Sequence, residues 1–138
     1  MAGEAPRRRG LIVDWGGVMT TSVFAAFDAF CRAEGLPAGR VASVFRDDPE
    51  GRALLVDLEC GRLDEAVFER RLAGLLGVAS DGLIGRLFQA ARDDSAMQDA
   101  VAAFRRAGVR TALLSNSWGT DWYDRGRWAE LFDAVVVS

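Results

Sequence analysis

A single carboxylate, Asp14, stands at the end of a short apolar run, and two glycines, Gly16 and Gly17, follow it after Trp15. The run, residues 11–13, consists of branched apolar residues, which predicts a buried strand. In an open α/β sheet, ligands bind beyond the carboxyl ends of the strands, where Asp14 would lie. A carboxylate at that place, beside glycines that let the backbone approach a ligand closely, is a candidate nucleophile or metal ligand.

A polar pair, Ser115 and Asn116, follows a second strand-like run at residues 109–114. Both runs are expected to be strands of one parallel sheet, so their polar ends would lie at the same edge. A carboxylate can attack phosphorus or an electrophilic carbon, while a hydroxyl and backbone N–H groups can bind oxygens that gain charge. Because phosphoryl oxygens would repel Asp14, a divalent cation is expected between them.

The stretch between the two strands is helical in its periodicity. Apolar residues recur there at three- and four-residue steps, and glycine and proline breaks separate several short helices. Asp64 is expected to cap one helix, and the acidic pairs at 47–48 and 93–94 are interpreted as solvated caps. Trp118, Trp122 and Trp128 are interpreted as packing against the helices rather than as lining a pocket.

A helix–strand–helix–strand pattern follows from residue 95, with residues 135–137 as a further buried strand. The sequence therefore predicts an α/β fold with a parallel three-layer, Rossmann-like core made by residues 1–19 and 95–138. Residues 20–94 are predicted to form an all-helical insertion in that core.

The composition excludes several kinds of chemistry. Of the 138 residues half are hydrophobic, the net charge is -3, and there is no histidine. Histidine acid–base catalysis, Ser-His triads and histidine metal sites are therefore excluded, and nucleic acid is not expected as a partner. The apolar run after Arg9 is too short for a signal peptide or membrane helix. Cys31 and Cys60 are expected to be buried, reduced thiols of a cytoplasmic protein.

Residues 11–20 and 111–118 resemble the first and second motifs of the haloacid dehalogenase (HAD) superfamily of hydrolases. The stretches VDWGGV and TALLSNSW are most similar to the branch that contains the N-terminal phosphatase domain of soluble epoxide hydrolases. The predicted insertion at residues 20–94 lies where that superfamily places its helical cap. The resemblance covers nearly the whole chain but only two of the four motifs of the family.

The resemblance implies a role for each residue that matches these motifs. Asp14 would be the nucleophile and a ligand of Mg²⁺, and the backbone carbonyl of Gly16 would be a second ligand. Ser115 would hydrogen-bond the transferring phosphoryl group, and Asn116 would help position the substrate. Trp15 and Gly17 would supply backbone N–H groups around the phosphate.

Two departures from the family pattern bear on activity. The phosphatases usually carry a second aspartate two residues after the nucleophile, but Gly16 stands here and cannot transfer a proton. Such acid–base catalysis contributes about 10²–10⁴-fold to the rate. The third and fourth motifs would lie beyond Ser138, so we expect an incomplete core that binds Mg²⁺ poorly and has residues 11–13 as an exposed apolar edge. Self-association or a complementing C-terminal half is the expected partner.

The leading interpretation is a Mg²⁺-dependent phosphatase that acts on a small phosphorylated metabolite through an aspartyl-phosphate at Asp14. A small-molecule phosphoester is then the partner, with neither nucleic acid nor membrane involved. One alternative is a dehalogenase-type hydrolase, in which Asp14 attacks carbon. The other is a non-catalytic binding or scaffold relative that keeps the fold.

Overall fold

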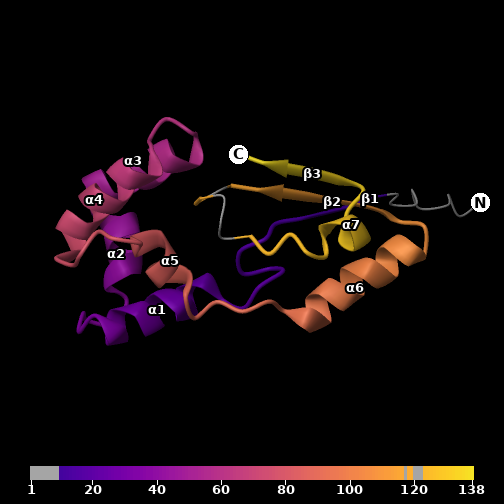
Figure 1. The fold of residues 1–138 in the computed structure, drawn as a ribbon, viewed down its shortest axis with the longest axis horizontal. Coiled ribbons are helices and arrows are strands. Elements are labelled where there is room, and N and C mark those ends of the chain that lie inside the picture. The colour runs from indigo at the N-terminus through magenta and orange to yellow at the C-terminus, as the bar shows by residue number, and fades with distance from the viewer. Residues whose placement is uncertain (1–9, 117, 120–122) are drawn as a thin grey trace, which may run out of the picture.

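A small parallel sheet forms one part of the molecule. The computed structural model describes residues 10–116, 118–119 and 123–138. Its strands are β1 (Gly10–Val13), β2 (Arg110–Ser115) and β3 (Ala134–Val137), in the order β1–β2–β3. All the pairs are parallel, and the register places Leu113 of β2 between Val13 and Val135. The protein is therefore mixed α/β, as predicted, and β1 lies at an edge of the described sheet (Figure 1).

The described residues also form seven helices. The helices between β1 and β2 are α1 (Val23–Ala33), α2 (Arg40–Asp47), α3 (Pro49–Glu59), α4 (Glu65–Leu76), α5 (Leu83–Phe88) and α6 (Ser95–Arg106), and α7 (Trp128–Leu131) precedes β3. Figure 1 shows α1 to α5 grouped at one end of the molecule, beside the carboxyl ends of the strands. We call this group the helical region, and the sheet with α6 and α7 the sheet region. None of the described helices is long and apolar enough to span a membrane.

The chain enters and leaves the helical region at one place. The N–H of Thr21 donates to the carbonyl of Arg92 at 2.8 Å, and the N–H of Asp94 donates to the carbonyl of Met19 at 2.9 Å. These two crossing segments run side by side below the sheet in Figure 1. The helical region is thus connected to the sheet region by a pair of adjacent segments, at residues 19–21 and 92–94.

Side-chain caps fix where several helices begin. Asp48, Asp64 and Asp94 each accept a backbone N–H from the first turn of α3, α4 and α6. Such caps satisfy N–H groups that have no partner within the helix. The predicted capping is confirmed for these three aspartates. Asp47 instead pairs with the neighbouring Arg46 at 2.8 Å.

The buried apolar residues form two clusters. The first lies within the helical region, and its fully buried members include Phe68, Leu54 and Leu72. The second lies between the sheet and its helices and includes Trp15, Met19, Val101, Leu113 and Leu131. Cys31 is buried in the first cluster, but Cys60 is exposed at the end of α3, so its predicted burial is wrong.

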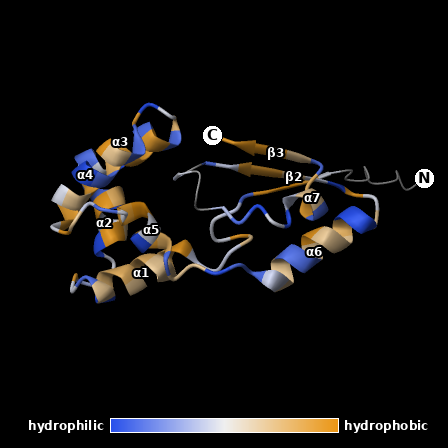
Figure 2. Ribbon diagram, in the orientation of Figure 1, coloured by the Kyte–Doolittle hydropathy of each residue, from blue (hydrophilic) through white to orange (hydrophobic). Residues whose placement is uncertain are grey.

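Helices cover one face of the described sheet. On the covered face Leu113 is 1% exposed, whereas Ile12, Leu114 and Val136 on the opposite face are 68%, 57% and 59% exposed. Figure 2 shows apolar residues along β2 and β3, with α6 and α7 lying to one side of them. Residues 11–13 and 135–137 do form strands, as predicted. The predicted burial is wrong for Ile12 and Val136, because α6 and α7 lie on the opposite face and side chains alternate along a strand. It is also wrong for Val135, which is 39% exposed.

Candidate functional site

Asp14 directly follows β1 and lies at the start of a tight turn. Its Oδ1 accepts the backbone N–H of Trp15 at 2.7 Å. The carbonyl of Trp15 then accepts the N–H groups of Val18 and Met19, at 3.0 and 2.8 Å. Gly17 adopts a φ of 73° in this turn, a conformation that glycine reaches without steric cost. Gly17 therefore allows the chain to turn directly after the strand and leaves Asp14 at the strand end.

Ser115 and Asn116 end the neighbouring strand. Because β1 and β2 are parallel, their carboxyl ends lie together, and both residues line one cavity with Asp14. The Oγ of Ser115, a buried residue, is 3.0 Å from the hydroxyl of Tyr123, which also donates to the backbone carbonyl of Asn116 at 3.0 Å. Burial raises the pKa of Tyr123, and the negative charge of Asp14 adds to this effect. Tyr123 is thus held as a neutral hydroxyl that fixes Ser115.

The cavity shared by these residues has a volume of about 600 Å³. Asp14, Gly16, Ser115 and Asn116 line it from the sheet region. The helical region contributes a mainly apolar lining with two charged residues: Val23, Phe24, Phe27, Ala42, Phe45, Arg46, Leu55, Glu59 and Phe88. We call this space the first cavity. It offers a polar group at the strand ends and room for an apolar ligand portion against the helices.

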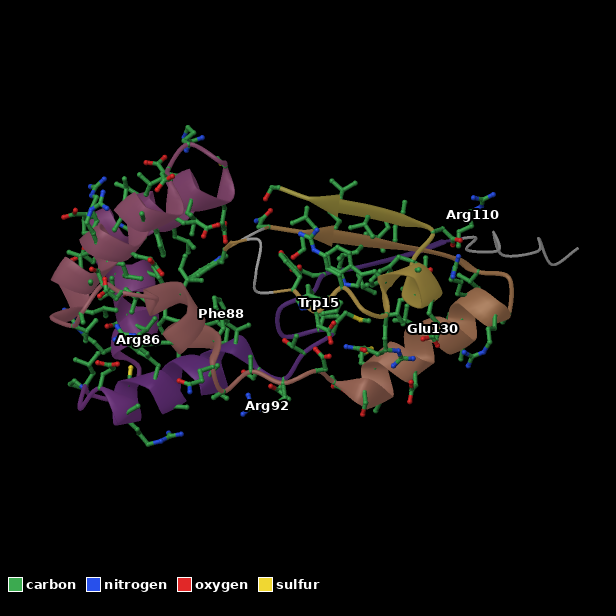
Figure 3. All side chains as sticks on the ribbon, viewed as in Figure 1. Trp15, Arg86, Phe88, Arg92, Arg110 and Glu130 are labelled. Atoms are coloured by element: carbon green, nitrogen blue, oxygen red, sulfur yellow. The ribbon has the colours of Figure 1, made fainter. Side chains whose placement is uncertain are left out.

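Trp118, in the segment after β2, connects the two regions. Its ring centroid lies 5.3 Å from those of Phe45 and Phe88, within the cluster of the helical region. Figure 3 shows Phe88 on the side of that region that faces the sheet. Trp118 thus packs against the helices, as predicted, and also lines the first cavity. Trp128 packs instead on Trp15 in the sheet region, and Trp122 lies outside the described residues.

Glu59, the last residue of α3, reaches toward the same segment. Its Oε1 accepts the indole N–H of Trp118 at 3.3 Å, and its Oε2 accepts an amide N–H of Asn116 at 3.4 Å. Glu59 also lines the first cavity. A carboxylate of the helical region is therefore held beside the polar residues of the sheet edge.

Two of the predicted phosphate-binding residues do not line the first cavity. The N–H of Trp15 donates to Asp14, and the N–H of Gly17 donates to Oγ1 of Thr20 at 3.0 Å. Trp15 is 1% exposed and packs against both Tyr123 and Trp128, whose rings also contact each other. The structure therefore brings together Asp14, Gly16, Ser115 and Asn116, and leaves Trp15 and Gly17 outside this group.

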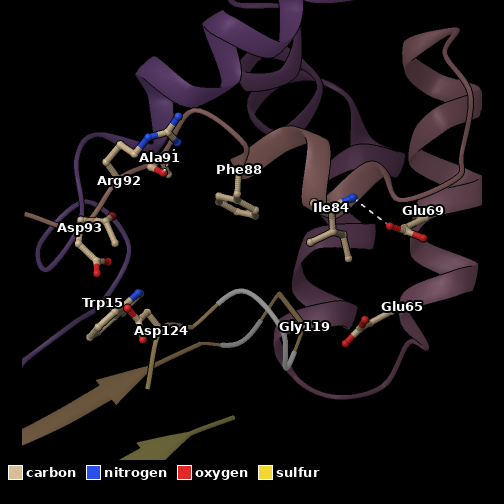
Figure 4. A pocket seen from close by; sticks show the side chains of 12 residues that line it. Trp15, Glu65, Glu69, Ile84, Phe88, Ala91, Arg92, Asp93, Gly119 and Asp124 are labelled. Atoms are coloured by element: carbon tan, nitrogen blue, oxygen red, sulfur yellow. Dashed lines mark hydrogen bonds between the residues drawn. The ribbon is translucent and has the colours of Figure 1, made fainter. Parts of the chain in front are cut away.

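A second cavity, of about 400 Å³, shares Phe88 with the first and is otherwise lined by different residues. Figure 4 shows Glu65 and Glu69 beside it on one side and Asp93 and Asp124 on the other. Glu69 accepts the backbone N–H of Ile84 at 2.9 Å, which ties α4 to the start of α5. Of the predicted site residues, Trp15 alone lines this second cavity.

The residues expected to bind Mg²⁺ are Asp14 and Gly16, and both line the first cavity. Mg²⁺ prefers oxygen ligands and is commonly held by one or two carboxylates, with water and substrate phosphate oxygens completing its shell. Asp14 and Gly16 fit a site of that kind. Within the part of the chain that the structure describes, no group of three or more acidic, cysteine or histidine residues could hold a metal by itself.

Glu59, Tyr123 and the aromatic lining were missed in the sequence. Tyr123 is the single tyrosine of the chain and follows Ser115 by eight residues, which could have drawn attention to it. Glu59 has no comparable signal, because its place depends on how α3 packs. No known protein-family model matches this sequence, and no curated protein matches it either.

Proposed function

We propose that this protein is a HAD-type hydrolase that uses Asp14 as a nucleophile on a small phosphomonoester. The observation that carries the proposal is the first cavity, where Asp14, Gly16, Ser115 and Asn116 meet from two adjacent strand ends. The helical region would be the cap of such an enzyme. Its connection through two adjacent segments at residues 19–21 and 92–94 fits an insertion between the first two strands of a Rossmann-like core.

The chemistry follows from the residues at the strand ends. Asp14 would attack phosphorus, form an aspartyl-phosphate and release the alcohol, and water would then hydrolyse the acyl phosphate and restore Asp14. The hydroxyl of Ser115 would bind a phosphoryl oxygen, and Asn116 would orient the substrate. A bound Mg²⁺ would reduce the repulsion between the carboxylate and the phosphoryl oxygens. The apolar helical lining favours a leaving alcohol with an apolar portion.

The test is a phosphatase assay in which the covalent intermediate is also sought. Because Mg²⁺ binding is expected to be weak, the protein is incubated with phosphomonoesters and a large excess of Mg²⁺; it should release phosphate, and rapid quenching should yield a phosphorylated protein by intact mass. Asp14→Asn should abolish both signals. Asp99→Asn, an exposed change on α6, is the matched control and should keep both. Phosphate release that survives in Asp14→Asn would contradict the proposal.

A dehalogenase-type hydrolase is the second candidate, and the apolar lining of the first cavity is the observation that favours it. Attack of Asp14 on carbon generates no phosphoryl charge that a cation must offset. Halide release from short haloacids without added metal, lost in Asp14→Asn, would support this reading. If neither phosphate nor halide is released, the binding or scaffold interpretation is the remaining one.

A further inference from the structure

The turn after Asp14 carries no side chain that could transfer a proton, because Gly16 and Gly17 occupy it. A phosphomonoester with an alkyl leaving group needs such a proton, since an alkoxide is a poor leaving group. Among the described residues that line the first cavity, Asp14 and Glu59 are the two that carry carboxylates. Arg46 also lines it, but a guanidinium does not release its proton in proteins.

We propose that Glu59 is the general acid and general base of this site; the inference rests on the proposed phosphatase function. In the first step the bond from an Asp14 oxygen to phosphorus forms and the bond from phosphorus to the leaving oxygen breaks. The proton moves from the Glu59 carboxyl group to the leaving oxygen, which departs as the alcohol. In the second step water attacks phosphorus, the bond from Asp14 to phosphorus breaks, and Glu59 takes the proton from the water.

The contacts of Glu59 hold its carboxylate beside the segment that follows β2, in the cavity that Asp14 also lines. Its two hydrogen-bond donors, Asn116 and Trp118, lie one and three residues after Ser115, which would bind the phosphoryl group. The two contacts, at 3.4 and 3.3 Å, are long for N–H···O bonds, so a leaving oxygen can compete for the carboxyl group. The side chain is partly buried at the end of α3, on the helical side of the cavity, where the leaving alcohol would lie.

The other glutamates near the strand ends are less suited to this role. Glu65 and Glu69 line the second cavity, and Glu69 is engaged by the N–H of Ile84. Glu50 lies on the same helix as Glu59, but it is exposed and pairs with Arg71 at 3.0 Å. Glu50→Gln is therefore a matched control, since it removes a carboxylate from α3 without altering the first cavity.

Two substrates whose leaving groups differ in their need for a proton distinguish proton transfer by Glu59 from a positioning role. The ratio kcat/KM reports steps up to departure of the leaving group, and nitrophenolate departs without protonation. With benzyl phosphate, Glu59→Gln should lower kcat/KM by about 10²–10⁴-fold. With 4-nitrophenyl phosphate, kcat/KM should stay close to that of the unaltered protein, while kcat falls and a burst of nitrophenolate appears because hydrolysis of the aspartyl-phosphate has slowed. Glu59→Asp should recover part of the activity, and Glu50→Gln should leave kcat and kcat/KM unchanged with both substrates.

Each other outcome has a definite meaning. Equal losses of kcat/KM for both substrates would overturn proton transfer and leave Glu59 as a positioning residue for Asn116 and Trp118. No loss with either substrate would overturn any role for it. If the unaltered protein hydrolyses neither ester, or if Asp14→Asn still does, the proposed phosphatase function fails, and the role of Glu59 fails with it.

Discussion

The helical region and the sheet region bury their apolar residues in different ways. In the helical region five short helices surround one cluster, and Phe68 and Leu72 at its centre are inaccessible to solvent. In the sheet region the helices cover one face, and Ile12, Leu114 and Val136 stay more than half exposed on the other. Parallel sheets are normally covered on both faces, so the sheet region is the unusual one.

This difference also separates what each region gives to the candidate site. The sheet region supplies the polar groups Asp14, Ser115 and Asn116, which come directly from strand ends. The helical region supplies the apolar lining and Glu59. Trp118 follows β2 of the sheet region in sequence but packs in the helical region, because its ring lies among Phe45, Phe68 and Phe88. The strand ends thus supply three polar residues of the candidate site, and the helices supply its apolar lining together with the carboxylate of Glu59.

The largest expected effect compares two adjacent leucines of β2. Leu113, on the covered face, is 1% exposed, and Leu114, on the other face, is 57% exposed. Leu113→Ala should lower the free energy of unfolding by about 2–5 kcal/mol, because it leaves a cavity in a packed cluster. Leu114→Ala should lower it by only about 0.5 kcal/mol, as for other surface positions. Urea unfolding followed by circular dichroism measures both.

The same pair can break the comparison. If Leu114→Ala lowers the free energy of unfolding as much as Leu113→Ala does, the face of the sheet that carries Leu114 is covered in solution. The oligomeric state of the unaltered protein, measured by light scattering across a range of concentrations, then shows whether another copy covers it. Because the two substitutions are identical in chemistry, the ratio of their effects depends on burial alone.

The sequence predicted well the features that local patterns determine. A branched apolar run bounded by glycines predicted β1, and a strand-like stretch that ends at Ser115 and Asn116 predicted β2. Acidic residues at the starts of helices predicted the caps at Asp48, Asp64 and Asp94. The polar residues at two parallel strand ends were expected to meet, and the structure places Asp14, Ser115 and Asn116 around one cavity. These features need only the periodicity and the ends of individual elements.

Features that depend on the packing of distant segments were not predictable. Ile12 and Val136 were predicted to be buried because they are branched and apolar. Their burial, however, depends on whether other elements pack on that face of the sheet, which the sequence of the strand does not determine. Glu59 enters the site because α3 ends opposite the segment after β2, 57 residues further along the chain. Backbone turns also escaped prediction, because the N–H groups of Trp15 and Gly17 are used within the turn itself.

A smaller effect compares one cap from each region. Asp64 accepts the N–H of Ala66 at the start of α4, and Asp94 accepts that of Met97 at the start of α6. Replacing either aspartate by alanine should lower the free energy of unfolding by about 1 kcal/mol. We expect one shared transition in both variants, since Trp118 packs into the helical cluster and connects the regions. If unfolding of Asp64→Ala shows two transitions, and only the midpoint of the earlier one is lowered, the two regions unfold separately.

The smallest expected effect is a pH dependence that again differs between the regions. In the sheet region the backbone N–H of Thr111 and the guanidinium of Arg105 hold the pKa of Asp133 below its ordinary value. A carboxylate with a depressed pKa stabilises the fold fully at pH values above its pKa in the unfolded chain, which is about 4. This stabilisation is lost as the pH falls through the lower pKa of the folded state. Asp133→Asn should therefore flatten the decline of stability at acidic pH.

In the helical region Arg46 lowers the pKa of Asp47, but these two are neighbours in sequence, so an unfolded chain keeps much of the same interaction. Asp47→Asn should flatten the acid profile less than Asp133→Asn does, when unfolding is measured from pH 7 downward. An equal flattening in both would mean that contacts between distant elements are not what gives Asp133 its effect.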